Sequence, residues 1–149
     1  MGVVTREATV NATENEIWAA LIDDPNRWPE WLTPLAGLED EVSGSAREGL
    51  EFGARIGRMG GRIRIVEAKR GERLRWQAGP SALLAMGMGM SGTLELHAAG
   101  DHATHVHLRM KSPLGPMGGR LMKMMAGLTS KDEMTKTIAR IKELSEHSH

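Results

Sequence analysis

Residues 10–31 read VNATENEIWAALIDDPNRWPEW, and this stretch decides how the whole chain is interpreted. Thr13 is a good N-cap residue and Glu16 follows three positions later, which is the spacing of a capping box at the start of a helix. The apolar residues that follow at helical spacing are Ile17, Trp18, Leu21 and Ile22. An Asp-Pro pair ends this helix at Pro25, and a second short helix is predicted to carry the Trp-Pro-Glu-Trp segment 28–31.

The residues on either side of this stretch alternate between apolar and polar, which predicts antiparallel strands with one buried face. Residues 3–10 form the first such strand, and one of its inward positions holds a cation, Arg6. Beyond residue 35, the inward positions of further strands are Leu50, Phe52, Ala54, Ile56, Ile63, Ile65, Leu74 and Trp76. A long strand is then expected to place inward Met86, Met88, Met90, Leu94 and Leu96, and its return partner Thr104, Val106, Leu108 and Met110. The pattern predicts about seven strands in one meander.

After residue 113 the apolar period becomes 3.6, which predicts a long helix from Met117 to Leu144. Its apolar stripe comprises Leu121, Met125, Leu128, Met134, Ile138, Ile141 and Leu144. A single sheet must cover its apolar face, and this helix is the one element long enough to do so. We therefore expect an α+β fold in which residues 1–149 form one domain. A curved sheet wraps around the C-terminal helix, and two short helices follow the first strand.

The composition excludes several classes of protein. The 149 residues are 40% hydrophobic and 26% charged, which is typical of a globular protein. Lys plus Arg and Asp plus Glu both number 19, which argues against a general nucleic-acid binder. The chain has no cysteine, so disulfides, thiolate metal sites and cysteine nucleophiles are excluded. With no apolar run long enough for a membrane span and no targeting segment, we expect a cytoplasmic protein that does not insert into membranes.

The stretch 10–31 closely resembles the start of proteins of the SRPBCC superfamily (START-related, polyketide cyclase/dehydrase and pollen-allergen-like). In these proteins a strand leads through a small residue into a Trp-bearing helix, then Asp-Pro and a Trp-Pro-x-Trp turn. The matching positions are Ala12, Ile17, Trp18, Asp24, Pro25, Trp28, Pro29 and Trp31. The order of elements from Val3 to Leu144 also matches the helix-grip fold of that superfamily. The chain looks most like its small bacterial polyketide cyclase/dehydrase members, and the resemblance implies a cavity between sheet and long helix for a lipid-like or polycyclic molecule.

The candidate ligand-binding residues are apolar, with one cation. They are Arg6, Trp28, Trp31, Phe52, Trp76, Met88, Met90, Met110, Met117, Leu121 and Met125. Methionine adapts to varied apolar partners, so facing clusters of it suit a deformable cavity, although they suit a packed core equally well. The two tryptophans of segment 28–31 would either line the mouth of the cavity or plug the end of the sheet. A buried cation at Arg6 would need a carboxylate, backbone carbonyls or an anionic ligand group, unless its side chain reaches out at the sheet edge.

Three other patterns have simpler explanations. Gly87, Gly89 and Gly92 match G-x-G-x-x-G, but residues 93–97 continue as a strand, so we expect no nucleotide loop; Gly87 and Gly89 would bend the strand. The outer-face cluster His97, His105 and His107 is predicted to place His97 opposite His105 and Glu95 opposite His107, a surface cluster rather than a metal site. Outward arginines form a basic face of Arg55, Arg58, Arg62, Arg64, Arg73 and Arg75, which we interpret as an ordinary solvated surface.

These observations predict that the chain binds a hydrophobic small molecule as a carrier or sensor. We expect no metal and no cofactor, no specific nucleic-acid partner, and a monomer or homodimer. One alternative is a polyketide cyclase or dehydratase working in the same cavity. The pocket Tyr that such cyclases are thought to use is missing, because the chain has no Tyr, so no catalytic residue is assigned. Another alternative is a toxin-like or ribosome-interaction module that uses the arginine face.

Overall fold

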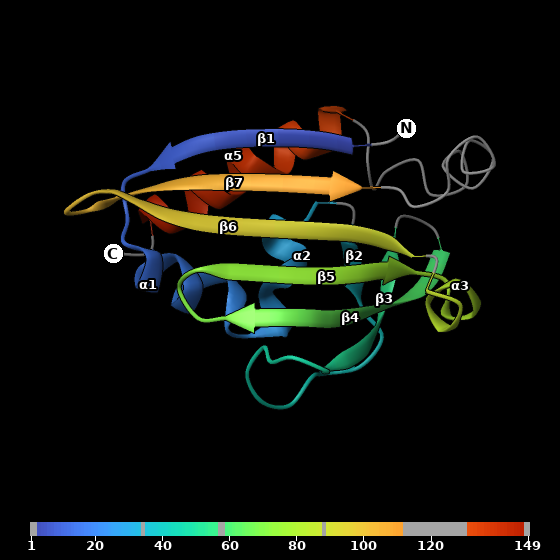
Figure 1. The fold of residues 1–149 in the computed structure, drawn as a ribbon. Coiled ribbons are helices and arrows are strands. Elements are labelled where there is room, and N and C mark those ends of the chain that lie inside the picture. Colours follow the sequence, from blue (N-terminus) through green and yellow to red (C-terminus); the bar gives the residue numbers. More distant parts are fainter. Residues whose placement is uncertain (1–2, 34, 57–58, 88, 112–130, 148–149) are drawn as a thin grey trace.

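The computed structural model describes residues 3–33, 35–56, 59–87, 89–111 and 131–147. One curved sheet dominates the structure, with the helices lying against one of its faces and at its ends (Figure 1). The strands are β1 (Val3–Val10), β2 (Leu35–Leu38), β3 (Glu51–Ile56), β4 (Met59–Lys69), β5 (Arg73–Gly79), β6 (Met90–Gly100) and β7 (Ala103–Lys111). The helical elements are α1 (Glu14–Ile17), the π-helical turn η1 (Trp18–Ile22), the 3₁₀ turn η2 (Pro25–Arg27), α2 (Trp28–Trp31), α3 (Ser81–Ala85) and α5 (Lys131–His147).

The seven strands form a single antiparallel sheet in the order β1-β7-β6-β5-β4-β3-β2. Strands β2 to β7 are a meander in which each strand pairs with the next one along the chain. Strand β1 joins this meander at its far end by pairing with β7, so that Arg6 lies opposite Leu108. The predicted α+β architecture is confirmed, and β1 beside β7 is the one departure from a simple meander.

The alternation of the sequence determines the two faces of the sheet. In β3, for example, Phe52, Ala54 and Ile56 are buried, while the residues between them are half-buried or exposed. In β6 and β7, Leu94 and Leu108 are paired and buried on the same inner face. The outer face carries the charged residues, because strand side chains point alternately to opposite faces.

The capping box predicted at Thr13 is present. The Thr13 hydroxyl accepts a hydrogen bond from the Glu16 backbone N–H at 3.1 Å, and the Glu16 carboxylate accepts one from the Thr13 N–H at 2.9 Å. Helix α1 continues into η1, which closes when the Asp23 N–H donates to the Trp18 carbonyl. Asp24 then caps η2 by accepting from the Asn26 N–H at 3.0 Å, with Pro25 at the first position. The starts of α1 and η2 are therefore determined by capping residues that lie next to them in the sequence.

Helix α5 lies across the inner face of the sheet, where it contacts β1, α2 and η1 (Figure 1). Met134, Ile138 and Ile141 are its buried apolar residues in the described part of the helix, as the apolar stripe predicts, and Thr137 and Ser145 are buried as well. The first half of the predicted helix, from Met117 to residue 130, lies outside the described residues. At its other end the helix continues to His147, and in its last turn Glu146 accepts a hydrogen bond from the Asn11 N–H at 2.9 Å.

The predicted start of the sixth strand is wrong. Residues 81–85 form α3, and Met86 follows it with 67% of its surface exposed instead of lying in a strand. Gly87 has φ +71° and its N–H donates to the Leu84 carbonyl, so the chain turns here, and β6 begins only at Met90. The expectation that Gly87 and Gly89 bend the strand was therefore wrong as well. The Met-Gly alternation mimicked a strand because a five-residue helix is too short to show its own period.

Candidate functional site

An aromatic cluster occupies the centre of the inner face. Trp28 lies 5.7 Å from Trp31, 5.6 Å from Phe52 and 6.0 Å from Trp76, measured between ring centroids, and Trp31 lies 6.2 Å from Trp76. The rings meet at steep angles, an arrangement that aromatic pairs favour over face-to-face stacking. All four side chains are buried. The cluster joins α2 to β3 and β5, and so connects the helical layer to the sheet.

The indole N–H groups of the cluster on α2 are bonded within the protein. Trp28 Nε1 donates to the Ile22 carbonyl and Trp31 Nε1 to the Leu21 carbonyl, each at 2.9 Å. Both acceptors lie at the end of η1, where the last turn leaves carbonyl groups without a helical partner. In this structure the two tryptophans thus close the end of η1 and present ring surface to the interior.

Trp76 packs directly over Gly92 on the neighbouring strand. A Cβ atom built on Gly92 would lie 2.3 Å from Cε2 and Cζ2 of the indole, and Trp76 is opposite Gly92 in the β5–β6 register. Only glycine leaves room for the ring at this height above the sheet. In the sequence, Gly92 stands out only as part of a false nucleotide motif. A glycine flanked by inward apolar residues in a strand is itself a signal of such a close approach.

Arg6 faces inward from β1, as the alternation predicts, and is half-buried. Its Nε donates to the Thr135 hydroxyl on α5 at 3.1 Å, and its Nη1 donates to the Thr5 carbonyl at 2.8 Å. Both acceptors are neutral. The guanidinium therefore lies between the sheet and the C-terminal helix with no carboxylate among its hydrogen-bond partners in the described part of the chain.

Two of the candidate methionines are placed by the structure. Met90 and Met110 are both buried on the inner face, at 3% and 1% exposure. Met90 lies opposite Ala78, and Met110 lies opposite Gly92, so both are near Trp76. The other candidates, Met88, Met117, Leu121 and Met125, lie outside the described residues. The structure thus brings Phe52, both tryptophans of α2, Trp76, Met90 and Met110 to one face, with Arg6 at the β1 side.

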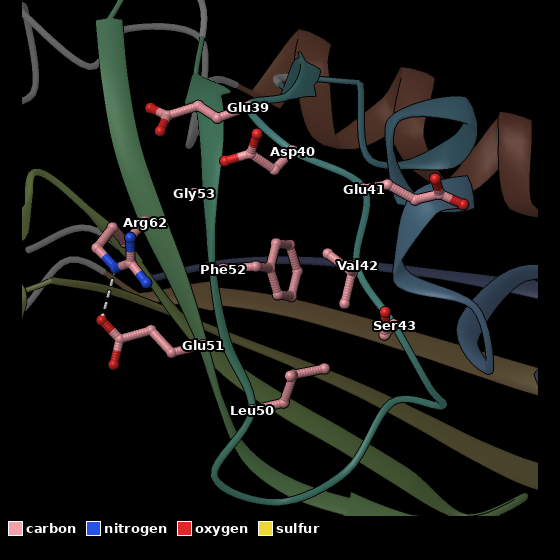
Figure 2. A pocket seen from close by; sticks show the side chains of 10 residues that line it. All are labelled: Glu39, Asp40, Glu41, Val42, Ser43, Leu50, Glu51, Phe52, Gly53 and Arg62. Atoms are coloured by element: carbon pink, nitrogen blue, oxygen red, sulfur yellow. Dashed lines mark hydrogen bonds and ion pairs between the residues drawn. The ribbon is translucent and has the colours of Figure 1, made fainter.

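A groove of about 320 Å³ opens between β3 and the segment that follows β2. Figure 2 shows Phe52 pointing toward Val42 inside it, with Glu51 and Arg62 on the opposite side of β3. The ring of Phe52 forms part of the lining while its edge contacts Trp28, so the groove adjoins the aromatic cluster. The residues lining the groove are Glu39, Asp40, Glu41, Val42, Ser43, Leu50, Glu51, Phe52, Gly53 and Arg62.

Two pairs of hydrogen bonds hold the walls of this groove in place. The Asn26 side chain accepts from the Val42 N–H and donates to the Val42 carbonyl, both at 2.8 Å, and so holds the segment in place. Glu51 accepts from Arg62 at 2.8 Å and from Arg64 at 3.2 Å, and the Arg62 hydrogen bond in particular holds the pKa of Glu51 below its ordinary value. The groove could not be found from the sequence, because residues 39–41 are three consecutive acidic residues, a pattern typical of a solvated surface segment. Only the folded chain places them beside Phe52.

The outer-face histidines have the predicted register, with His97 opposite His105 and Glu95 opposite His107. Glu7 on β1 joins them, which the hairpin alone could not predict: its carboxylate lies 3.1 Å from His105 Nε2. In the part of the chain that the structure describes, no group of three or more His, Asp or Glu side chains is arranged to hold a metal ion.

Several arginines of the outer face are already paired. Arg62 and Arg64 share Glu51, and Arg73 lies 3.4 Å from both Glu67 and Glu95. These contacts support the interpretation of an ordinary solvated sheet face. Arg58 lies outside the described residues.

Nearly the whole chain also matches a known family. The model of a family described as polyketide cyclase / dehydrase and lipid transport matches residues 1–146. The chain belongs to this family. No curated protein matches the chain significantly.

Several solved structures are similar to this chain and share its fold. MLL2253 from Mesorhizobium loti has a TM-score of 0.70 at 15% identity, covering 99% of this chain and 98% of its own. A Thermobifida fusca protein has a TM-score of 0.65 at 17% identity, covering 100% and 99%. The Aha1 dimer from Colwellia psychrerythraea has a TM-score of 0.62 at 15% identity, covering 99% and 98%. At such identities the likeness establishes the fold and not the activity.

Membership of the polyketide cyclase/dehydrase and lipid transport family implies a domain that binds a hydrophobic ligand. The inner face described above has the matching chemistry, since aromatic and aliphatic side chains dominate it and Arg6 supplies one cation. None of the helices in the described ranges is both long enough and apolar enough to cross a membrane.

Proposed function

We propose that the protein binds a lipid-like or polycyclic small molecule between the inner face of the sheet and the C-terminal helix, as a carrier or sensor. The observation that carries the proposal is the inner face itself: a continuous cluster of buried aromatic and aliphatic side chains beside a half-buried guanidinium whose hydrogen-bond partners in the described ranges are neutral. The proposal includes a monomer or homodimer working in the cytoplasm.

Burial of apolar ligand surface supplies the binding free energy. Each Å² of apolar surface removed from water contributes about 25 cal/mol before the costs of ordering are subtracted. Met90 and Met110 suit such a surface because the unbranched thioether changes shape at low cost. The methionines at 88, 117 and 125, with Leu121, belong to the same proposed lining.

Arg6 is proposed to orient the polar end of the ligand. Its present acceptors, the Thr135 hydroxyl and the Thr5 carbonyl, are both uncharged. A carboxylate or phosphate is a stronger acceptor for a guanidinium, because charge-assisted hydrogen bonds are about twice as strong as neutral ones. The proposal therefore favours an amphipathic ligand with an anionic or strongly polar end.

The test begins with native mass spectrometry of the protein purified from its own host, followed by identification of any molecule that co-purifies. A stoichiometric apolar adduct supports the proposal. The same protein is then titrated with long-chain fatty acids and with polycyclic phenols while tryptophan fluorescence is recorded, since the chain has 4 Trp and no Tyr. No adduct and no saturable change with either class would overturn the proposal.

The role of Arg6 is tested with Arg6→Gln, and Arg47→Gln is the matched control. Arg47 also donates to a backbone carbonyl, that of Ser45, but its side chain is exposed. Arg6→Gln should weaken a fatty acid about tenfold and its uncharged alcohol analogue much less. If Arg6→Gln lowers the affinity equally for the two ligands, or if Arg47→Gln lowers it as much, Arg6 is not part of the binding site.

A polyketide cyclase or dehydratase acting in the same cavity is the second candidate. Arg6 favours it, because a cation on an apolar face could stabilise negative charge that develops on a substrate oxygen. If this function is correct, Arg6→Gln lowers turnover of a poly-β-keto substrate far more than it lowers affinity. The third candidate, an interaction module on the arginine face, has less support because Arg62, Arg64 and Arg73 are already ion-paired.

A further inference from the structure

A second hollow lies on the outer face of the sheet, on the opposite side from the proposed ligand site. It has a volume of about 240 Å³ and is lined by Arg75, Ser91, Thr93, Arg109 and Lys111. All five point outward, because the residues that alternate with them, such as Trp76, Gly92 and Met110, are buried on the inner face. The lining is polar throughout and contains three cations, two hydroxyls and no carboxylate.

The strand register determines how these residues face one another. Arg75, Thr93 and Arg109 form one row across β5, β6 and β7, and Ser91 and Lys111 are paired in the next row. Neighbouring strands lie about 4.8 Å apart, which places the two arginine Cα atoms about 10 Å from each other with Thr93 between them. Lys111 lies about 7 Å along β7 from Arg109. Three long cationic side chains therefore surround two short hydroxyl side chains.

The cations of this hollow differ from the other cations of the outer face. The adjacent row holds Arg73, Glu95, His107 and Glu7, and these residues contact one another across the strands. By contrast, no contact within the described ranges pairs Arg75, Arg109 or Lys111 with an acidic side chain. Glu67 lies opposite Arg75 in the register, but its carboxylate is 3.4 Å from Arg73.

This local excess of positive charge does not follow from the composition, because the chain has a formal net charge of zero. Three like charges whose Cα atoms lie within about 12 Å of one another repel, and an anion placed among them relieves that repulsion. The hollow is also more than a diffuse charged patch, since Ser91 and Thr93 provide two hydroxyl donors at its centre.

We propose that this hollow binds a phosphate group. A guanidinium can donate two parallel hydrogen bonds to a phosphate, and Lys111 adds a third charge. The hydroxyls of Ser91 and Thr93 donate to the remaining oxygens. A phosphate dianion can use all five groups, whereas a carboxylate has too few oxygens to do so. The phosphate belongs either to a small phosphate ester or to a phospholipid headgroup; half-exposed Val3, opposite Lys111, would face the lipid in the second case.

The first experiment is an NMR titration of the labelled protein with inorganic phosphate, in which sodium chloride keeps the ionic strength constant. We expect saturable amide shifts centred on residues 91–93 and 109–111. Arg109→Gln should weaken binding about tenfold, as loss of a hydrogen bond to a charged group predicts. Thr93→Val keeps the shape and the charge but removes one hydroxyl, and should weaken binding about threefold.

Arg140→Gln is the matched control for charge. It makes the same change in net charge, but Arg140 lies on α5 and donates to the Glu30 carbonyl. Its phosphate affinity should equal that of the unchanged protein. All the substituted side chains of the hollow are exposed or half-buried, so thermal unfolding of each variant should match the unchanged protein within a few degrees.

A second experiment distinguishes the two sources of phosphate. Co-sedimentation is measured with phosphatidylcholine vesicles, with and without phosphatidic acid. The site is assigned to a headgroup if the protein binds the acidic vesicles, if Arg109→Gln weakens that binding about tenfold, and if free phosphate competes it away. Saturable phosphate binding without vesicle binding assigns it to a small phosphate ester. The proposal is overturned if millimolar phosphate shifts neither segment, or if Arg109→Gln and Thr93→Val bind phosphate and vesicles as Arg140→Gln does.

Discussion

Replacing Gly92 by alanine tests whether the aromatic cluster is packed as tightly as the structure indicates. The added Cβ would lie 2.3 Å from the Trp76 ring, and that ring is held from its other side by Trp28 and Trp31 at 6.0 and 6.2 Å between centroids. The indole cannot swing away as the end of a flexible side chain could. Either the ring or the β5–β6 pairing must shift.

The size of the effect follows from two opposing contributions. Overpacking a well-filled core costs about 1–3 kcal/mol, and the clash with a fixed ring belongs at the upper end. Replacing glycine by alanine within a strand returns about 0.5–1 kcal/mol of backbone entropy. We expect Gly92→Ala to lower the free energy of unfolding by about 2 kcal/mol, or Tm by about 4–8 °C.

Gly37→Ala is the control, because its Cβ would meet no atom within 4 Å and Gly37 also lies in a strand. It should leave stability unchanged or raise it slightly. The assay is urea unfolding followed by tryptophan fluorescence, repeated in a Trp76→Leu background, where the smaller side chain leaves room for the Cβ. If Gly92→Ala costs the same in both backgrounds, the clash with Trp76 is not the cause and the reasoning is refuted.

Three further predictions concern the segments that support the site. Thr13→Ala should lower the free energy of unfolding by about 1 kcal/mol because it removes the capping box, whereas Thr13→Ser should keep most of the original stability. Equal urea midpoints for the two variants would contradict this. Asn26→Ala should lower the free energy of unfolding by about 1–3 kcal/mol, because both backbone groups of Val42 lose their hydrogen-bond partner. Unchanged hydrogen exchange at the Val42 amide would show that these hydrogen bonds do not hold the segment. Arg62 lowers the pKa of Glu51, so the ionised carboxylate stabilises the fold above the ordinary pKa of 4.5, and this contribution is lost as pH falls through the lowered value. Stability of Glu51→Gln should therefore fall less between pH 7 and acid than that of the unchanged protein, and identical pH profiles in urea unfolding would argue against the pair.

The sheet could be predicted from the sequence wherever two conditions were met: regular alternation and a turn of definite length. The β6–β7 hairpin met both, so the facing of His97 with His105 was predicted residue by residue and confirmed. The α1 start was equally predictable, since a capping box is a signal contained within four residues.

The errors and omissions arise where a signal is too short or not local. Helix α3 has five residues, which is too few to show a helical period, so the alternation that continues through Met86 and Gly87 led to the prediction of a strand. The role of Glu7 beside His105 depends on β1 pairing with β7, which no local pattern encodes. Arg109 and Lys111 likewise became part of a basic hollow only when Arg75 was placed two strands away. Within the strands that were correctly predicted, the alternation of apolar and polar residues indicated the face of each residue, and the order of strands in the sheet determines which residues meet.

The pairing of β1 with β7 also has a consequence for the order in which the protein can fold. The two strands are separated by roughly one hundred residues, so this ladder is the most distant contact in the sheet and closes late. At synthesis rates of about 5–20 residues per second, β1 leaves the ribosome about 5–20 s before its partner exists. Throughout that time its edge has no β7 to pair with, and Arg6 and Glu7, adjacent charges of opposite sign, discourage other strands from pairing there. Strand β1 is thus synthesised before the other six strands but is among the last to pair. Its charged side chains discourage incorrect strand pairing in the nascent chain, before the native ladder forms.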